Sequence, residues 1–308
     1  MVKCTLCGRR EAFFMRLYSG EKLCKRCFQE SIITKVRSTI SKYRMLEPRD
    51  RIAVAVSGGK DSVTLLHIMV EIEKRFPSTL YAVTIDEGIR GYRDEAMEIA
   101  AENCKKLGVE HITLSFKELY GYTLDEIVKL TKGKDLAPCS YCGVLRRKAL
   151  NIAAKNAKVD KLATAHNLDD ETQTILLNLM HGSPFRMAKI KPVTLITRDG
   201  FVKRIKPLCE VPEREIALYA YLKGIRFQSV PCPYAGEALR NDIRNILNRL
   251  EEKHPGIKYT IYRSMEKIRP ALESFIEEPE MGRCKICGEP AVGDVCQSCQ
   301  MLQELGIL

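Results

Sequence analysis

Cysteine is the residue whose spacing says most about the chemistry of this chain. Ten of the thirteen cysteines occur in Cys-x-x-Cys pairs, a spacing that brings two thiolates onto one metal ion. Two pairs lie near each end of the chain, so each end offers the four thiolates that close a tetrahedral zinc site. The sequence therefore predicts two Zn²⁺ ions, bound by Cys4, Cys7, Cys24 and Cys27 at one end and by Cys284, Cys287, Cys296 and Cys299 at the other.

Both terminal segments are too short to bury a hydrophobic core. Metal binding, worth on the order of 10 kcal/mol, would supply most of their folding energy. Because all four ligand positions of each ion are filled, we expect no catalysis there. Two roles stay open, namely structural support alone and a surface that helps to bind RNA or to join subunits.

Three further cysteines, Cys139, Cys142 and Cys232, belong to neither end of the chain. Three thiols are too few for a closed zinc site, but three thiolates can hold a cubane iron–sulfur cluster and leave its fourth iron open. Alternatively, two of them could form a persulfide and a resolving thiol, because a helix N-terminus lowers the pKa of a thiol. A third possibility is an inert pair in a loop with an unrelated buried cysteine.

A glycine-rich loop is the sharpest motif outside the cysteines. It follows a short apolar strand, precedes a helical pattern and consists of Ser57, Gly58, Gly59, Lys60, Asp61 and Ser62. Two glycines let backbone N–H groups approach phosphate oxygens, and the start of the helix adds partial positive charge. Lys60 can neutralise a phosphate. Since Gly-Lys is followed by Asp61 and not by Ser or Thr, the loop is not a Walker motif.

Apolar strands alternate with helical patterns through the middle of the chain, which predicts an α/β fold with a parallel sheet covered by helices on both faces. Ligands of such sheets bind at the carboxyl ends of the strands. The expected strands span residues 51–56, 80–85, 111–116 and 162–165, and the expected helices span residues 61–75, 93–107, 145–157 and 168–180.

Four units follow from these patterns. We expect an N-terminal zinc ribbon over residues 1–30, a nucleotide-binding domain over 31–235, a helical segment over 236–280 and a C-terminal zinc ribbon over 281–308. From Glu213 to Phe275 the pattern is helical, with breaks near Pro231 and Pro233 and at residues 254–256.

Composition narrows the possible partners. The formal charge of +11 falls to about +6 once thiolates carry two zinc ions and one cluster, so the chain stays basic, as expected for a partner of nucleic acid. No stretch approaches the roughly 20 apolar residues of a membrane span, and we expect a cytoplasmic protein. The basic runs that could follow a phosphate backbone are residues 146–148, residues 203–206, and Arg240, Arg244 and Arg249.

The loop from Ser57 to Ser62 resembles the SGGxDS signature of PP-loop ATP pyrophosphatases, which cleave ATP to AMP and pyrophosphate. This resemblance implies that ATP binds at the loop and that Asp61 lies near the phosphates and Mg²⁺. It also implies an adenine site at the ends of the strands, at the positions Ala55, Val56, Ile85 and Ala165.

Over essentially its whole length the chain is similar to the tRNA 2-thiouridine synthetases. The likeness rests on the PP-loop, Cys139 with Cys142, the later Cys232, the segment from His166 to Asp170 and the cysteine module at each end. It implies that the three cysteines carry a four-iron four-sulfur cluster, that a ubiquitin-like carrier delivers sulfur to a homodimer, and that Arg146 and Asp170 are catalytic or contact ATP. Because Arg146 stays charged, it can stabilise charge but cannot transfer a proton.

The predicted reaction is adenylation of the uridine O2 by ATP followed by replacement of AMP with sulfur, in either a T-loop 5-methyluridine or a wobble uridine. Its catalytic residues would be Cys139, Cys142, Cys232, Asp61, Arg146 and Asp170. One rival is a PP-loop ligase that transfers nitrogen, such as a lysidine synthase. Another is a non-catalytic zinc-ribbon RNA-binding protein. The sulfur-transfer hypothesis requires that folding bring the three cysteines together within reach of the nucleotide.

Overall fold

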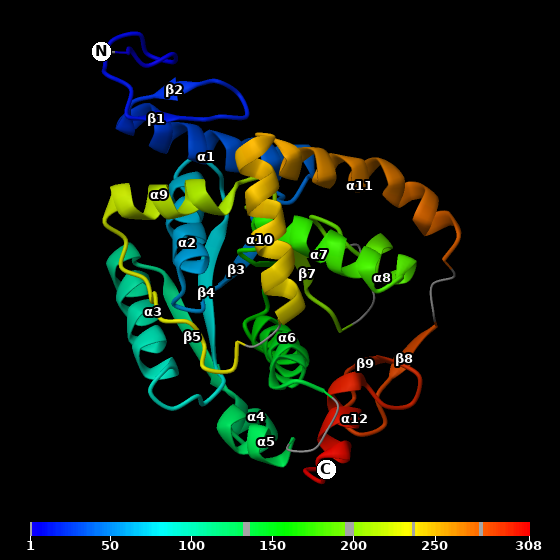
Figure 1. Ribbon diagram of the computed structural model, residues 1–308. Helices are drawn as coiled ribbons and strands as arrows, with labels where there is room; N and C mark the ends of the chain where they lie inside the picture. The colour runs from blue at the N-terminus through cyan, green and yellow to red at the C-terminus, as the bar shows by residue number, and fades with distance from the viewer. Residues whose placement is uncertain (1, 132–135, 195–199, 236–237, 277–279) are drawn as a thin grey trace.

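The computed structural model describes residues 2–131, 136–194, 200–235, 238–276 and 280–308. Its centre is a five-stranded sheet in which every neighbouring pair is parallel, as the sequence predicts (Figure 1). In spatial order the strands are β5 (Glu110–Ser115), β4 (Thr79–Asp86), β3 (Arg51–Ala55), β6 (Lys161–Ala163) and β7 (Lys203–Ile205).

Helices cover both faces of the sheet, because successive side chains of a strand point to opposite sides. Ile52 and Val54 of β3 enter one core, whereas Ala53 between them enters the other. The first core is closed by α1 (Lys25–Lys42), α2 (Lys60–Glu73), α3 (Arg93–Leu107) and α9 (Glu213–Lys223). The second is closed by α4 (Phe116–Tyr120), α5 (Leu124–Leu130), α6 (Pro138–Asn156) and α12 (Gln297–Glu304).

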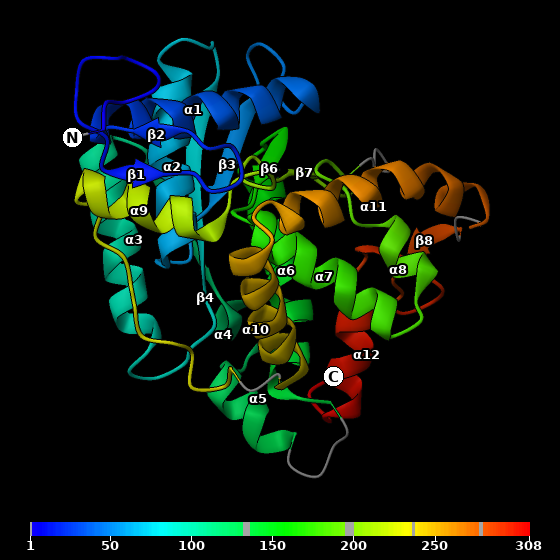
Figure 2. The same cartoon turned by 45° about the horizontal axis from the view of Figure 1, so that its top comes forward.

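The remaining helices pack beside the sheet, where α10 (Ala238–Lys253) and α11 (Ile257–Ser274) lie against α7 (Leu168–Met180) and α8 (Pro184–Ala188) (Figures 1 and 2). The predicted break at residues 254–256 is confirmed, and Gly256 there has a φ of 96°. The break before Pro231 comes earlier than expected, because Gly224 in the left-handed conformation already ends α9.

The cysteine modules stand at opposite ends of the molecule (Figure 1). The N-terminal module contains β1 (Phe14–Met15) and β2 (Lys22–Leu23), and the C-terminal one contains β8 (Met281–Arg283) and β9 (Pro290–Val292). The expected boundary at residue 30 falls inside α1, so the N-terminal module and the sheet domain share a helix. Among the described residues, no helix combines the length and the apolar character that a membrane crossing requires.

The site is formed where the segments that follow β3 and β6 meet. β3 lies between β4 and β6, and the chain leaves β3 for one side of the sheet and returns to the other side at β6. Such a reversal of strand order opens a crevice at the carboxyl ends of the two strands. The loop after β3 and the segment after β6 therefore meet at this crevice, and these are the predicted nucleotide loop and the segment from His166 to Asp170.

Candidate functional site

The nucleotide loop has the backbone geometry that its glycines predict. Gly58 has a φ of 83°, and a Cβ atom there would lie 2.4 Å from the carbonyl oxygen of Ala96, so no larger residue fits. Gly59 is the N-cap residue of α2, and no side chain caps this end of the helix. The first N–H groups of α2 are thus left for an anion, which is the arrangement that binds phosphate.

Two residues that sequence reasoning missed brace this loop from behind. The backbone N–H of Gln228 donates to the Gly58 carbonyl oxygen at 2.9 Å, and its side chain donates to the carbonyl oxygen of Tyr92. The buried guanidinium of Arg93 donates to the Ser57 carbonyl oxygen at 2.9 Å. Nothing in the local sequence marks Gln228, whereas Arg93 is a charged residue among the apolar positions of a helical pattern.

Carboxylates gather beside the loop. The Lys60 ammonium lies 2.8 Å from an Asp61 oxygen and 3.2 Å from a Glu213 oxygen, so it is shared between two acids. Burial raises the pKa of Asp170 to about 6, helped by the charges of Asp61 and Glu213. Carboxylate oxygens that repel one another next to a phosphate-binding loop fit Mg²⁺, which prefers oxygen ligands shared with substrate phosphates. Glu213, at the first position of α9, had not been predicted.

Asp170 provides a pH test. An unfolded aspartate has a pKa near 3.8, so between that pH and about 6 the folded protein holds a proton that the unfolded chain has lost. The stability that this proton confers is full below the unfolded pKa and disappears as the pH rises through about 6. Relative to Asp170→Asn, the wild type should lose about 1 kcal/mol of unfolding free energy between about pH 5 and pH 7. Chemical denaturation without nucleotide or metal measures this, and an unchanged difference would contradict the raised pKa.

The predicted adenine positions end neighbouring strands. Ala55 is the last residue of β3, Val56 follows it, Ile85 lies one residue before the end of β4, and Ala165 comes two residues after β6. β3 pairs with β4 and with β6, so these positions share one edge of the sheet. Their role in binding adenine stays a prediction that this placement allows.

The three central cysteines are brought together by Tyr234. Cys139 and Cys142 lie in the first two turns of α6, which begins at Pro138 and not at residue 145 as the helical pattern suggested, because proline fits the first turn of a helix. The Cys139 thiol donates to the Tyr234 carbonyl oxygen at 2.9 Å, and the Tyr234 backbone bonds the sulfur of Cys232. The chain from Cys232 to Tyr234 thereby carries the lone cysteine to the pair.

A cluster suits these cysteines better than a single ion does. Among the described residues, only the two terminal sets of cysteines have all their sulfurs within 4.8 Å of one another. Three thiolates that are not packed around one ion can instead each bind a different iron of a cubane cluster.

The pKa values of the central thiols correct one expectation. Burial raises the pKa of Cys142 to about 12 despite the charge of Arg146, and burial also raises the pKa of Cys232. Burial of Cys142 thus opposes the lowered pKa that the persulfide alternative assumes for a thiol at a helix N-terminus. An iron ion held by these thiols would deprotonate them outright, so a raised pKa does not prevent them from acting as cluster ligands.

A chain of charged side chains joins the nucleotide loop to the cysteine helix, with Glu87 and Arg93 buried and Arg146 half-exposed. Arg93, which holds the Ser57 carbonyl, lies 2.7 Å from one oxygen of Glu87, although its N–H is not aligned for a linear hydrogen bond. The other Glu87 oxygen lies 3.6 Å from the guanidinium of Arg146, one turn after Cys142 on α6. Glu87 is 3% exposed. Glu87 therefore contacts both Arg146 and Arg93, the arginine that holds the nucleotide loop. The sequence analysis did not identify Glu87.

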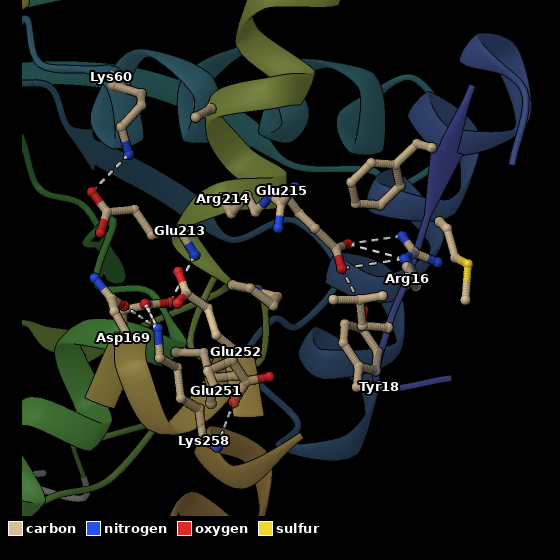
Figure 3. A pocket seen from close by; sticks show the side chains of 17 residues that line it. Arg16, Tyr18, Lys60, Asp169, Glu213, Arg214, Glu215, Glu251, Glu252 and Lys258 are labelled. Atoms are coloured by element: carbon tan, nitrogen blue, oxygen red, sulfur yellow. Dashed lines mark hydrogen bonds and ion pairs between the residues drawn. The ribbon is translucent and has the colours of Figure 1, made fainter. Parts of the chain in front are cut away.

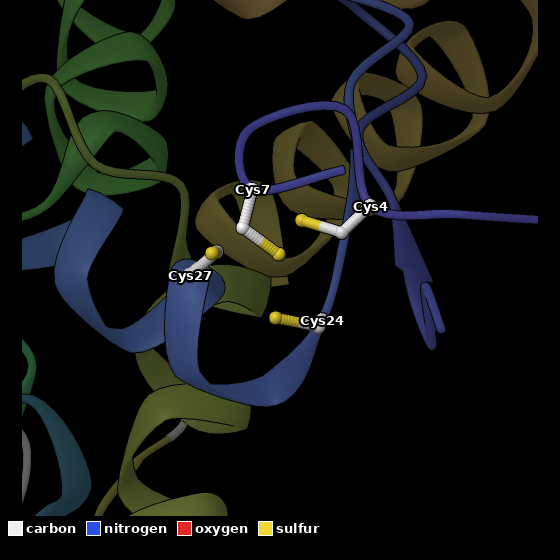
Figure 4. A group of neighbouring side chains, drawn as sticks. All are labelled: Cys4, Cys7, Cys24 and Cys27. Carbon is white, nitrogen blue, oxygen red and sulfur yellow. The ribbon is translucent and has the colours of Figure 1, made fainter. Parts of the chain in front are cut away.

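The N-terminal module fits zinc. Its four sulfurs converge between a loop and the start of α1 (Figure 4), and all lie within 4.8 Å of one another. Backbone N–H groups of Arg10 and Arg9 lower the pKa of Cys7 to about 6, which favours the thiolate that a metal needs. Donor number, distance and charge thus suit a tetrahedral Zn²⁺ site with Cys4, Cys7, Cys24 and Cys27 as ligands.

The C-terminal module fits zinc in the same way, with Cys284, Cys287, Cys296 and Cys299 within 4.8 Å of one another. It is attached to the cysteine helix, because Lys148 of α6 donates to Cys299 and Cys296 at 3.6 and 3.9 Å. Lys155 of the same helix forms an ion pair with Glu289 at 2.7 Å. A lysine against two thiolates offsets part of the negative charge of a four-thiolate site.

The N-terminal module is joined to the site across a pocket of about 530 Å³ (Figure 3). Arg16 enters from the module and forms hydrogen bonds with Glu215, which lies on α9 two residues after Glu213. At the other side of the pocket Asp169 accepts the N–H of Glu213 at 2.8 Å and pairs with the buried Lys258 of α11. These contacts hold the start of α9 next to Lys60.

The parallel sheet, the glycine loop at its switch point and the adjacent carboxylates define an ATP-binding protein of the PP-loop class. Residues 29–251 match the PP-loop domain family. A tRNA-5-methyluridine(54) 2-sulfurtransferase of Pyrococcus horikoshii is 38% identical over 97% of this chain and 93% of its own length. The tRNA 2-thiolation protein NcsA of Haloferax volcanii is 37% identical over 99% of both chains.

A solved structure agrees with these relatives. The U34-tRNA thiolase NcsA from Methanococcus maripaludis, described with its [4Fe-4S] cluster, aligns with a TM-score of 0.87 and 37% identity, covering all of this chain and 98% of that one. The chain belongs to the PP-loop family of tRNA 2-thiolation sulfurtransferases. Neither the nitrogen-transferring rival nor the non-catalytic rival fits these relatives.

Proposed function

We propose that this chain is a tRNA uridine 2-sulfurtransferase that uses ATP to exchange the O2 of a uridine for sulfur. The observation that carries the proposal is the connection of charged side chains from the nucleotide loop to the cysteine helix, through Arg93, Glu87 and Arg146. A nitrogen-transferring ligase has no need of three cysteines beside its nucleotide site. A protein without catalysis has no need to join them.

The reaction divides into two steps. The uridine O2 attacks the α-phosphorus of ATP, pyrophosphate leaves, and the resulting AMP ester makes O2 a good leaving group. Sulfur then bonds to C2 and AMP departs with the oxygen. Three cysteine thiolates would hold a [4Fe-4S] cluster whose open iron can supply the sulfur.

The side chains and backbone of the protein bind the reacting groups in position and offset their negative charge. The start of α2 and the loop bind the phosphates, and Asp61, Asp170 and Glu213 would hold Mg²⁺ against them. Arg146, held by Glu87, offsets negative charge that develops between the two halves of the site. Its guanidinium acts by charge alone because it does not lose its proton.

The proposal extends to partners and metals. Two Zn²⁺ ions would stabilise the terminal modules, a ubiquitin-like carrier would deliver sulfur, and the chain would act as a homodimer. Support comes from the four-sulfur groups and from the family to which the chain belongs. Whether the target is the T-loop 5-methyluridine or the wobble uridine is decided by locating the thiolated nucleoside in the product.

The test is an anaerobic assay of reconstituted protein with ATP, sulfide and unmodified tRNA. We expect one AMP for each thiouridine formed. Separate alanine substitutions of Cys139, Cys142 and Cys232 should abolish thiolation, whereas Cys104→Ala, a change to a buried core thiol, should not. Wild-type protein that releases no AMP and forms no thiouridine would refute the proposal. Triple-alanine protein that still joins a nitrogen nucleophile to RNA would favour the ligase.

A further inference from the structure

Two arginines that the mechanism does not use lie beside the cysteine helix. Arg147 follows Arg146 on α6, and its guanidinium folds back over Gly143, where an added Cβ would lie 3.3 Å from it. Gly143 follows Cys142 directly, so Arg147 reaches toward the cluster cysteines. Arg204 of β7 donates to the Arg147 carbonyl oxygen at 3.0 Å. Two segments that lie far apart in the sequence thus place two guanidinium groups near each other along α6.

In the part of the chain that the structure describes, no acidic side chain neutralises these two cations. Among the described residues, neither Arg147 nor Arg204 has a carboxylate within ion-pair distance, whereas nearby Lys206 lies 2.8 Å from Glu171. Burial and the neighbouring charge of Arg146 lower the pKa of Arg147, and burial and Arg147 lower the pKa of Arg204 to about 10. An anion bound between the two guanidinium groups would offset the repulsion between them.

The lowered pKa of His166 reflects the same excess of positive charge. This histidine ends the β6 segment, and its ring forms a hydrogen bond with the Thr164 hydroxyl at 3.0 Å. Burial and then the charges of Lys206, Arg146 and Arg204 lower its pKa to about 3. Solvent nevertheless reaches His166 and Arg147. A ligand that approaches from solvent can therefore reach both side chains.

We propose that Arg147 and Arg204 bind a phosphodiester of the RNA backbone next to the nucleotide that is thiolated. The inference rests on the proposed function, because it takes RNA as the substrate. Planar guanidinium groups suit phosphate oxygens, and a phosphodiester removes the repulsion between the two arginines.

Position distinguishes this phosphate from those of ATP. The ATP phosphates belong at the loop that precedes α2, whereas Arg147 and Arg204 lie on α6 and β7, on the cysteine side of the switch point. If the C2 of a uridine lies between the nucleotide loop and the cysteines, a phosphate of the same RNA strand would lie next to Arg147 and Arg204. The two arginines would thereby set the register of the RNA.

The experiment uses the full chain with its metals reconstituted and compares Arg147→Gln, Arg204→Gln and the double variant with the wild type. Binding of unmodified tRNA is measured against salt concentration. Each single substitution should weaken binding about tenfold and should reduce the slope of log affinity against log salt by about 1. Arg226→Gln is the matched control, because it removes an arginine that pairs with exposed Glu102 at 2.7 Å. Arg204→Lys should keep the wild-type slope, since the charge remains.

Two results would overturn the inference. Variants whose salt slope equals that of the Arg226→Gln control would overturn the inference, even if their folding is intact. A raised KM for ATP with unchanged tRNA affinity would also overturn it, because the phosphate would then belong to the nucleotide. Failure of the proposed function would look different, since the wild type itself would form no thiouridine.

Discussion

Arg16→Met should lower the free energy of unfolding by about 3–5 kcal/mol, the cost of leaving a buried charge without its partner. Arg16 is 4% exposed, and it forms hydrogen bonds with the carboxylate of Glu215, which is 2% exposed. Lys35 lies 3.7 Å from the same carboxylate, beyond hydrogen-bond distance, so it replaces the lost hydrogen bonds poorly. The Glu215 carboxylate would then lose the guanidinium that balances its charge.

The loss should also reach the ATP site, since Glu215 lies in the first turn of α9, the turn that holds Glu213 next to Lys60. We expect a higher KM for ATP in the fraction that stays folded. Chemical denaturation measures the first effect, and AMP formation at several ATP concentrations measures the second. Arg26→Met is the matched control, because Arg26 is 68% exposed and its pair with Glu30 should contribute less than about 1 kcal/mol. Equal stabilities of the two variants would disprove the role assigned to Arg16.

Glu87→Gln should reduce the kcat of thiolation about 100-fold, equivalent to about 3 kcal/mol of transition-state stabilisation. The neutral amide cannot balance the charges of Arg93 and Arg146, which lie 2.7 and 3.6 Å from the two carboxylate oxygens. Arg146 would then lose the contact that aims it between loop and cysteines. Because the cysteines and the loop glycines are unchanged, cluster absorbance should persist and the KM for ATP should change much less than kcat.

A double-mutant cycle separates positioning from general damage. If Glu87 acts through Arg146, then Glu87→Gln in an Arg146→Gln background should cost far less than it does in the wild type. Glu102→Gln, which removes the exposed partner of Arg226, is the control for a lost carboxylate and should leave kcat unchanged. Additive losses in the cycle would show that Glu87 supports the fold and does not position Arg146.

Local patterns were enough to predict the parts of this protein that follow local rules. The apolar runs predicted the parallel strands, and the helices over residues 93–107 and 168–180 were predicted with their observed bounds. Glycine in the loop could be predicted because φ and close backbone approach are properties of single positions. The cysteine spacings likewise predicted the four-sulfur groups at the two ends, since each group forms from neighbouring segments.

Contacts between distant segments could not be predicted in this way. Arg16 and Glu215 lie 199 residues apart, and Cys139 meets the backbone of Tyr234 across 95 residues. No periodicity or motif links Gln228 to Gly58, or Glu87 to Arg146, because the charge or amide of each acquires a partner only when the sheet and its covering helices are assembled.

Residue types and spacing by themselves determined the kinds of chemistry available here, namely phosphate binding by a glycine loop and metal binding by paired thiolates. Tertiary structure alone decided that these chemistries share one site. The reason is electrostatic as well as geometric. Glu87 and Arg93 are stable in the interior only as partners, so the packing that pairs them also draws the nucleotide loop toward the cysteine helix.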